Sequence, residues 1–274
     1  MIKINEKIVS QIPIIEVVKT DLVNLSIPLC VFYHGWQSCK ERALTHAYEI
    51  AKRGYRVVVA DSIYHGQRAP IEGPQPNQFF ETLLENINEF PDIVSEYEEK
   101  GLYNGFLAVG GYSMGGMTSA MLLTAYSYID AAVILMGSLD MLSYREWLIK
   151  TLFPNYERQF NEVEKRNDEK IMLEIEKYNL ANQPECIDGR PIYVWHGEMD
   201  DIVPVEFSRM LLDKIEDEPY AKSVYRKYDA KARHNVPFSE SVRISEFLLA
   251  ASKKNHEYLW QETQKNMKQR FGYN

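Results

Sequence analysis

A short glycine-rich segment places a serine where it could act as a nucleophile. Gly111-Tyr112-Ser113-Met114-Gly115 follows a short apolar run and precedes an apolar segment with helical spacing. In that context a Gly-x-Ser-x-Gly sequence is typical of a sharp strand-to-helix turn. Glycines on both sides of the serine suit a strained turn, and the helix that follows would bring N–H groups near the hydroxyl. Ser113 is therefore the candidate nucleophile; a glycine-rich packing turn without chemistry is the alternative.

A serine hydroxyl needs a base at neutral pH, and the base needs an acid that orients it. Of six histidines, His234 lies on a loop after the last predicted strand and is the candidate base. A solvated surface histidine is the alternative for this residue. His34 and His196 each end an apolar run directly before Gly, which indicates structural roles. His46 lies in a predicted helix, and His256 lies in the C-terminal tail. His65 lies in a loop that could line a site, although packing suits it better.

Three aspartates could orient the base. Asp200 and Asp201 follow the predicted strand 191–195 and precede a helix, where either could also be a plain N-cap. Asp140 follows another strand and is a more distant candidate. The chain order serine, aspartate, histidine agrees with one known class of catalytic triad. The residues themselves leave the choice among the aspartates open.

Strand and helix patterns alternate around these residues. Apolar runs without polar alternation predict strands buried on both faces, at 29–33, 55–60, 106–109, 131–136, 191–195 and 224–228. Apolar residues at helical spacing predict helices between them, at 44–51, 80–87, 117–125, 207–215 and 244–248. Pro91 should kink or break the second helix. The alternation predicts a parallel sheet covered by helices on both faces, with its chemistry at the carboxyl ends of the strands.

Two segments depart from this rhythm. Residues 2–19 contain two short alternating runs, which we expect to form edge strands. Residues 140–183 are densely charged and carry apolar side chains at steps of three to four, which predicts a helical lid inserted into a single domain spanning 1–274. A solvated helix pair without a functional role is the alternative. No internal repeat or linker marks a second domain.

Composition narrows the function classes. With 31 Lys and Arg against 39 Asp and Glu, the net charge is −8, which disfavours nucleic acid as a partner. Three cysteines without Cys-x-x-Cys spacing predict neither a disulfide framework nor a zinc site, which fits the cytoplasm. The start has no signal-peptide pattern, and glycines interrupt the uncharged stretch 101–129, so we expect no membrane span. No metal or dinucleotide motif occurs, so no cofactor is expected, and a homo-oligomer is left open.

These motifs together resemble the α/β-hydrolase family over nearly the whole chain. The resemblance rests on His34-Gly35-Trp36, Gly111–Gly116, the pattern His196-Gly197-x-x-Asp200-x-x-Val203-Pro204, and His234. Within the family, the chain is most similar to small bacterial esterases related to dienelactone hydrolases and to the catalytic domains of prolyl-oligopeptidase-type peptidases. The segment 61–68 resembles their Asp-x-x-x-His-Gly loop.

The resemblance implies a fold and a set of site residues. The fold would be an α/β-hydrolase, with a mostly parallel sheet of about eight strands flanked by helices and the helical lid. The acid of the triad would be Asp200, and the backbone N–H groups of Trp36 and Met114 would form the oxyanion hole. Trp36 replaces the second glycine of the lipase pattern, which argues against a wide acyl site. Candidate pocket residues are Tyr64, His65 and Trp147.

The implied reaction is two-step acyl transfer through an acyl-enzyme. We expect a serine hydrolase that cleaves small-molecule carboxylic esters with small or medium acyl groups. A serine peptidase acting on short peptides is a second hypothesis, which ranks lower because no size-filtering domain fits within 274 residues. A non-catalytic binding protein of the same fold is the third. Family members with an aspartate nucleophile are disfavoured by Ser113.

Overall fold

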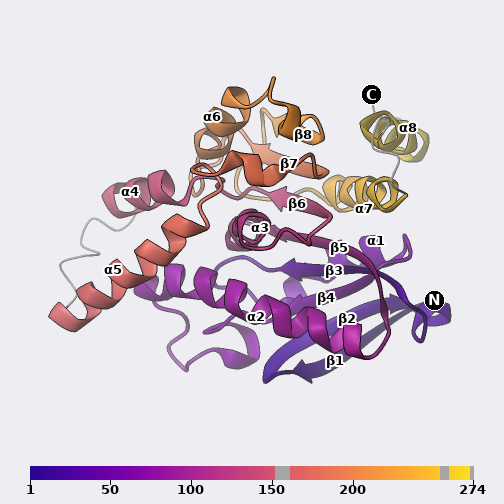
Figure 1. The fold of residues 1–274 in the computed structure, drawn as a ribbon, viewed down its shortest axis with the longest axis horizontal. Helices are drawn as coiled ribbons and strands as arrows, with labels where there is room; N and C mark the ends of the chain where they lie inside the picture. Colours follow the sequence, from indigo (N-terminus) through magenta and orange to yellow (C-terminus); the bar gives the residue numbers. More distant parts are fainter. Residues whose placement is uncertain (152–160, 254–258, 272–274) are drawn as a thin grey trace.

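A single eight-stranded sheet organises the chain (Figure 1). The computed structural model describes residues 1–151, 161–253 and 259–271. The strand order is β1-β2-β4-β3-β5-β6-β7-β8, with antiparallel pairing of β1 with β2 and of β2 with β4, and parallel pairing from β4 to β8. The strands are β1 Ile2–Val9, β2 Ile12–Lys19, β3 Ile27–Tyr33, β4 Arg56–Ala60, β5 Tyr103–Tyr112, β6 Ala131–Leu135, β7 Ile192–Gly197 and β8 Val224–Asp229. The predicted mostly parallel sheet is confirmed.

Helices cover both faces of this sheet (Figure 1). They are α1 Leu44–Ala51, α2 Phe79–Glu99, α3 Met114–Ala125, α4 Met141–Thr151, α5 Glu162–Lys177, α6 Glu206–Lys214, α7 Phe238–Ser252 and α8 Leu259–Phe271. One hydrophobic core lies between the sheet and α2, α3 and α6, and the other between the sheet and α1 and α7. Strand β3 shows why: Val31 and Tyr33 face the first core, while Phe32 faces the second.

The expectation of two edge strands at 2–19 is wrong for the second strand. β1 is the edge, whereas β2 pairs on both sides and is buried along nearly its whole length. The buried carboxylate of Glu16 makes this position tolerable, because it forms ion pairs with Lys7 of β1 at 2.7 Å and with Arg56 of β4 at 3.3 Å. Both partners lie on other strands, so the local pattern alone could not show that β2 is internal.

The predicted break at Pro91 does not occur. Helix α2 continues through Pro91 to Glu99. Proline lacks the N–H that would bond to the carbonyl four residues earlier, which is that of Ile87. The hydroxyl of Tyr126, at the end of α3, donates to this carbonyl at 3.0 Å. The lost helical bond is therefore replaced by a contact from a neighbouring helix.

The uncharged stretch 101–129 contains β5, the serine turn and α3. Within the described ranges, no helix combines the length and the apolarity that a membrane crossing requires. The predicted insertion 140–183 joins β6 to β7, and its described part contains α4 and α5 (Figure 1). Residues 152–160 of this segment lie outside the described residues.

Candidate active site

Ser113 occupies a strained turn between β5 and α3. Its backbone has φ 56° and ψ −121°, in the positive-φ region that side chains other than glycine rarely adopt. A Cβ atom on Gly111 would lie 2.4 Å from the carbonyl oxygen of Gly115, and one on Gly115 would lie 2.1 Å from that of Tyr33. Neither position has room for a side chain, so the two glycines are what allow the turn to lie against β3.

The structure brings the three predicted triad residues together. His234 Nε2 lies 2.8 Å from Ser113 Oγ, and His234 Nδ1 lies 2.7 Å from Asp200 Oδ2. Ser113 follows β5, Asp200 follows β7, and His234 lies in the loop after β8. All three side chains therefore come from the carboxyl ends of parallel strands, where this class of sheet gathers its functional groups. The arrangement can pass a proton from the serine hydroxyl to the imidazole.

Asp200 is held in its ionised form. Its Oδ1 accepts the backbone N–H groups of Ile202 at 3.0 Å and Val203 at 2.9 Å, and His196 Nε2 lies 3.3 Å from its Oδ2. Burial on its own would raise the pKa of Asp200, but hydrogen bonds from His196 and His234, the charge of His234 and the Val203 amide hold that pKa well below its usual range. A carboxylate that stays charged can orient His234 and stabilise it when protonated.

The other two candidate acids have different partners. The exposed Asp201 pairs with Arg233 at 3.2 Å. Asp140 accepts the backbone N–H of Ser143 at 3.2 Å and the Ser143 hydroxyl at 2.6 Å, in the first turn of α4. Neither interaction involves the imidazole, so Asp200 is the aspartate that the fold brings to the base.

Two of the remaining histidines have well-defined positions in the core. His34 Nδ1 donates to the Gly35 carbonyl at 2.8 Å, and its Nε2 accepts the Ser62 N–H at 3.2 Å. Burial lowers its pKa to about 4, so it is neutral at pH 7 and links the loops that follow β3 and β4. His46 is also buried, with a pKa lowered to about 4, and its Nδ1 lies 2.9 Å from Ser241 Oγ. His256 lies outside the described residues.

Of the two predicted oxyanion donors, Met114 directly follows Ser113, and Trp36 directly follows Gly35, where an added Cβ would lie 3.4 Å from Ser113 Cβ. Met114 is the first residue of α3, where the N–H groups have no acceptor within the helix. Trp36 lies in the loop that follows β3. A network that the sequence reasoning missed anchors this loop: the buried Asp61 accepts the backbone N–H of Lys40 at 2.9 Å and its Nζ at 2.8 Å. Its only signal in the sequence was the position of Asp61 in the Asp-x-x-x-His-Gly match.

Aromatic side chains extend from Trp36 to the inserted helix α4. The Trp36 ring lies edge-on to Phe79 at 5.3 Å between centroids, and Phe79 lies 6.1 Å from Tyr144. Tyr144 in turn packs against Trp147 at 5.9 Å and Phe207 at 6.0 Å. We refer to these five residues as the aromatic wall. Tyr144 and Phe207 were not predicted as site residues, because spacing shows only that they lie on the apolar faces of helices.

Two of the three predicted pocket residues lie along this wall. Trp147 is part of it, and the His65 ring lies edge-on to Trp36 at 4.7 Å. His65 is buried, which lowers its pKa, and its Nδ1 donates to the Ile63 carbonyl at 2.8 Å. The hydroxyl of Tyr64 instead lies near Glu81 of α2; partial burial and that carboxylate raise its pKa. The prediction for Tyr64 gains no support from these contacts.

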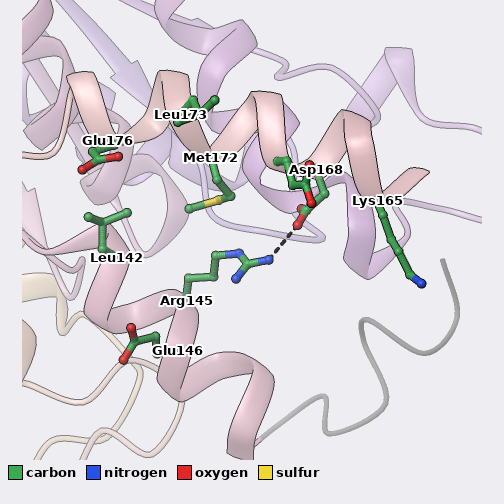
Figure 2. Close-up of a pocket in the computed structure, with 9 residues that line it drawn as sticks. Leu142, Arg145, Glu146, Lys165, Asp168, Met172, Leu173 and Glu176 are labelled. Atoms are coloured by element: carbon green, nitrogen blue, oxygen red, sulfur yellow. Dashed lines mark hydrogen bonds and ion pairs between the residues drawn. The ribbon is translucent and has the colours of Figure 1, made fainter. Parts of the chain in front are cut away.

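A cavity within the insertion is not lined by the triad. It measures 720 Å³, lies between α4 and α5, and is lined by residues such as Leu142 and Met172 (Figure 2). Arg145 of α4 bonds to Asp168 of α5 across it at 2.6 Å (Figure 2). A smaller cavity of 310 Å³ lies beside Tyr112, the neighbour of Ser113. Among the residues with described positions, no three His, Cys, Asp or Glu side chains gather as a metal site would require.

A serine at the turn after β5, with its histidine and aspartate at the ends of later parallel strands, defines an α/β-hydrolase. The structure of TT1662 from Thermus thermophilus shares this fold, with a TM-score of 0.71 and 18% identity over 94% of this chain and 99% of that chain. The prolyl oligopeptidase family matches residues 86–260, and the chain belongs to that family. It is therefore a hydrolase, and the predicted family resemblance is confirmed.

Two relatives match almost the full chain. "Putative esterase YitV" from Bacillus subtilis (strain 168) is 31% identical over 90% of this chain and 98% of its own length. "Esterase YjfP" from Escherichia coli (strain K12) is 28% identical over 86% of this chain and 94% of its own length. Both matches therefore extend over nearly the whole length of the relative.

Proposed function

We propose that the protein is a serine esterase that cleaves carboxylic esters with small or medium acyl groups through Ser113, His234 and Asp200. The observation that carries the proposal is the continuous contact from Ser113 Oγ to His234 at 2.8 Å and from His234 to Asp200 at 2.7 Å. Two relatives that match the chain over nearly their whole length are named as esterases, which supports esters as the substrate class.

The reaction follows from the protonation states of these groups. Ser113 Oγ attacks the ester carbonyl while His234 Nε2 takes its proton, and the Asp200 carboxylate stabilises the imidazolium. The N–H groups of Trp36 and Met114 hold the negative oxygen of the tetrahedral intermediate. His234 then gives its proton to the leaving alcohol and afterwards removes one from water. The hydroxide attacks the acyl-enzyme, and His234 returns the proton to Ser113 Oγ as the ester bond breaks, which releases the carboxylic acid and free Ser113.

We assign the preference for small and medium acyl groups to the aromatic wall and to the insertion 140–183. The insertion supplies Tyr144 and Trp147, and Trp36 lies at the other end of the wall. Trp36 directly follows Gly35, where an added Cβ would lie 3.4 Å from Ser113 Cβ. Bulky rings beside the oxyanion loop leave less room for an acyl chain than glycines would. In this proposal, the insertion acts as a lid over the acyl side of the site.

Hydrolysis of p-nitrophenyl acetate, butyrate and octanoate by the wild type and by Ser113→Ala tests the proposal. Loss of the nucleophile should lower kcat by up to ~10⁶-fold, the size of the effect in other serine hydrolases. Equal rates for the two proteins would contradict the proposal. Trp147→Ala should shift the preference towards octanoate, whereas an unchanged chain-length profile would remove the insertion from the acyl side. A fluorophosphonate that labels only the wild type would exclude a non-catalytic binding protein.

The family match favours a second candidate, a serine peptidase acting on short peptides. The same triad can open an amide by the same steps, so the site geometry does not separate the two activities. Release of the arylamine from prolyl and aminoacyl arylamides measures this activity directly. A kcat/KM higher on the arylamides than on the p-nitrophenyl esters would favour the peptidase.

A further inference from the structure

A cavity of 310 Å³ is lined by residues that directly neighbour the proposed nucleophile and base in the sequence. Tyr112, which directly precedes Ser113, and Asn235, which directly follows His234, both line it. Its walls therefore belong to the two chain segments that carry the nucleophile and the base. A group that fills this cavity lies against the segments that position the reacting atoms, so it is suited to hold part of a substrate.

The charge on the cavity wall is unbalanced. Of the residues that line it, only Arg42 carries a charge at neutral pH, because burial lowers the pKa of His46 to about 4. Arg42 lies in the turn Lys40–Ala43, is exposed, and forms no ion pair with a carboxylate in the part of the chain that the structure describes. In a protein with a net charge of −8, this is a local positive site. It favours an anionic group on the ligand.

The rest of the wall offers a surface for an apolar or aromatic body. Phe238, at the start of α7, is 56% exposed although it lines the cavity, and Val236 and Met136 lie beside it. Exposed aromatic rings at a concave site are typical of surfaces that bind ligands. The cavity therefore combines one cation with a small apolar surface.

The position of His234 determines which part of an ester reaches the cavity. His234 donates its proton to the leaving oxygen, so the alcohol part departs on the side of the base. The cavity borders the residues that follow His234, whereas the aromatic wall lies on the side of Trp36. We propose that this cavity is the subsite for the leaving alcohol and that Arg42 there binds an anionic group, a carboxylate or a phosphate, carried by that alcohol. The inference rests on the proposed esterase function.

A pair of acetate esters with the same acyl group and ring tests the inference. 4-Acetoxybenzoate carries a carboxylate on the leaving group, and 4-acetoxybenzamide is its neutral counterpart. Arg42→Gln should raise KM for the benzoate about fivefold, the upper range for a solvent-exposed ion pair, and leave the benzamide unchanged. Arg42→Lys should retain most of the affinity. Because each ester is compared between wild type and variant, differences in intrinsic reactivity cancel.

A matched control separates direct contact from the general field of the site. Arg233→Gln removes the same charge from the loop of the base, but Arg233 does not line the cavity. Two results would overturn the inference while the esterase function stands. One is an equal rise in KM for the benzoate in Arg42→Gln and Arg233→Gln. The other is an equal change in KM for the benzoate and the benzamide in Arg42→Gln. A wild type that cleaves neither ester would overturn the esterase function as well. With 4-acetoxyphenyl phosphate, a larger Arg42-dependent loss than with the benzoate would assign the anion as phosphate, and a smaller one as carboxylate.

Discussion

The carboxylate of Asp200 couples the stability of the protein to pH. Its pKa is held below the ordinary value of about 3.9 by hydrogen bonds that outweigh burial. Below about pH 5 the unfolded chain therefore binds more protons at this position than the folded chain does, so stability falls as the pH falls. In Asp200→Asn this part of the pH dependence should disappear, and urea unfolding between pH 3 and 7 measures it. Identical slopes in both proteins would contradict the assignment.

The same substitution should affect catalysis in a different way. An asparagine in this position cannot stabilise the imidazolium, and the tautomer of His234 that accepts the serine proton is no longer favoured. The expected fall in kcat is ~10⁴-fold, the size seen when the acid of another serine triad is replaced by its amide. Asp201→Asn is the matched control, because that side chain pairs with Arg233 and should leave kcat unchanged.

The two glycines on the α3 side of Ser113 should differ in their tolerance of alanine. A Cβ on Gly115 would lie 2.1 Å from a backbone oxygen of β3, whereas one on Gly116 would lie 3.0 Å from the nearest atom. Gly115→Ala should therefore lower the free energy of unfolding by about 1–3 kcal/mol and shift Ser113 away from His234. Gly116→Ala should show a smaller loss. Thermal unfolding together with kcat for both variants checks the order, and equal losses would contradict it.

The residues of the site were predictable where a short motif carries the steric or chemical requirement. Ser113 and His234 could be chosen from the glycine pattern and from their position after predicted strands. The choice of Asp200 over Asp201 came from the family resemblance, because the residues alone do not show in which direction a turn presents two adjacent side chains. Lys40 and Asp61 were missed for a related reason: their pairing joins two loops whose contact the sequence does not show.

At the scale of elements, helix α2 depends on the hydroxyl of Tyr126. Tyr126→Phe removes the donor to the Ile87 carbonyl, which Pro91 has already deprived of its helical partner. The expected loss is about 1 kcal/mol of unfolding free energy. In a Pro91→Ala background the helix can form its own bond to Ile87, so the same Tyr126→Phe change should have little effect. A double-mutant cycle by chemical denaturation measures the coupling, and an equal effect in both backgrounds would disprove it.

Most helices were predictable because their apolar residues recur every three to four positions. Most parallel strands were predictable because they are buried on both faces and therefore form continuous apolar runs. The errors came where a distant partner overrides the local signal. Glu16 and Pro13 made β2 look like an edge strand, and Pro91 predicted a kink or a break in α2, of which the break does not occur. In the first case two strands supply the cations, and in the second the end of α3 supplies a hydroxyl. No local pattern contains that information.

At the scale of the whole molecule, one buried cluster joins the terminal hairpin to the sheet and to α2. Arg56 is fully buried, pairs with Glu16 at 3.3 Å, and lies 5.8 Å from the ring of Tyr97 in α2. Glu16→Gln leaves this cation without its carboxylate and should lower the free energy of unfolding by about 3–5 kcal/mol. Lys7→Met is the matched control, because Lys7 is partly exposed and its loss should amount to about 1 kcal/mol or less.

Urea denaturation of the two variants at pH 7 provides the measurement. A loss of equal size in both would show that Arg56 finds another partner when Glu16 is neutral. The pKa of Glu16 is also lowered, since Lys7 and Arg56 outweigh the effect of its burial. The difference between wild type and Glu16→Gln should therefore shrink as the pH falls below the ordinary pKa of a glutamate, about 4.3.

Ser113 and His234 are separated by 121 positions along the chain. The turn of Ser113 depends on β5 packing beside β3 and β6, because the Ser113 N–H donates to the Leu135 carbonyl at 2.9 Å. The loop that carries His234 depends in addition on β8, which pairs with the sheet only through β7. During refolding, activity should therefore return later than the burial of Trp195 in β7, because such long-range pairing is slow. On the ribosome, the same order means that the contact between Ser113 and His234 can form only after all eight strands have been synthesised.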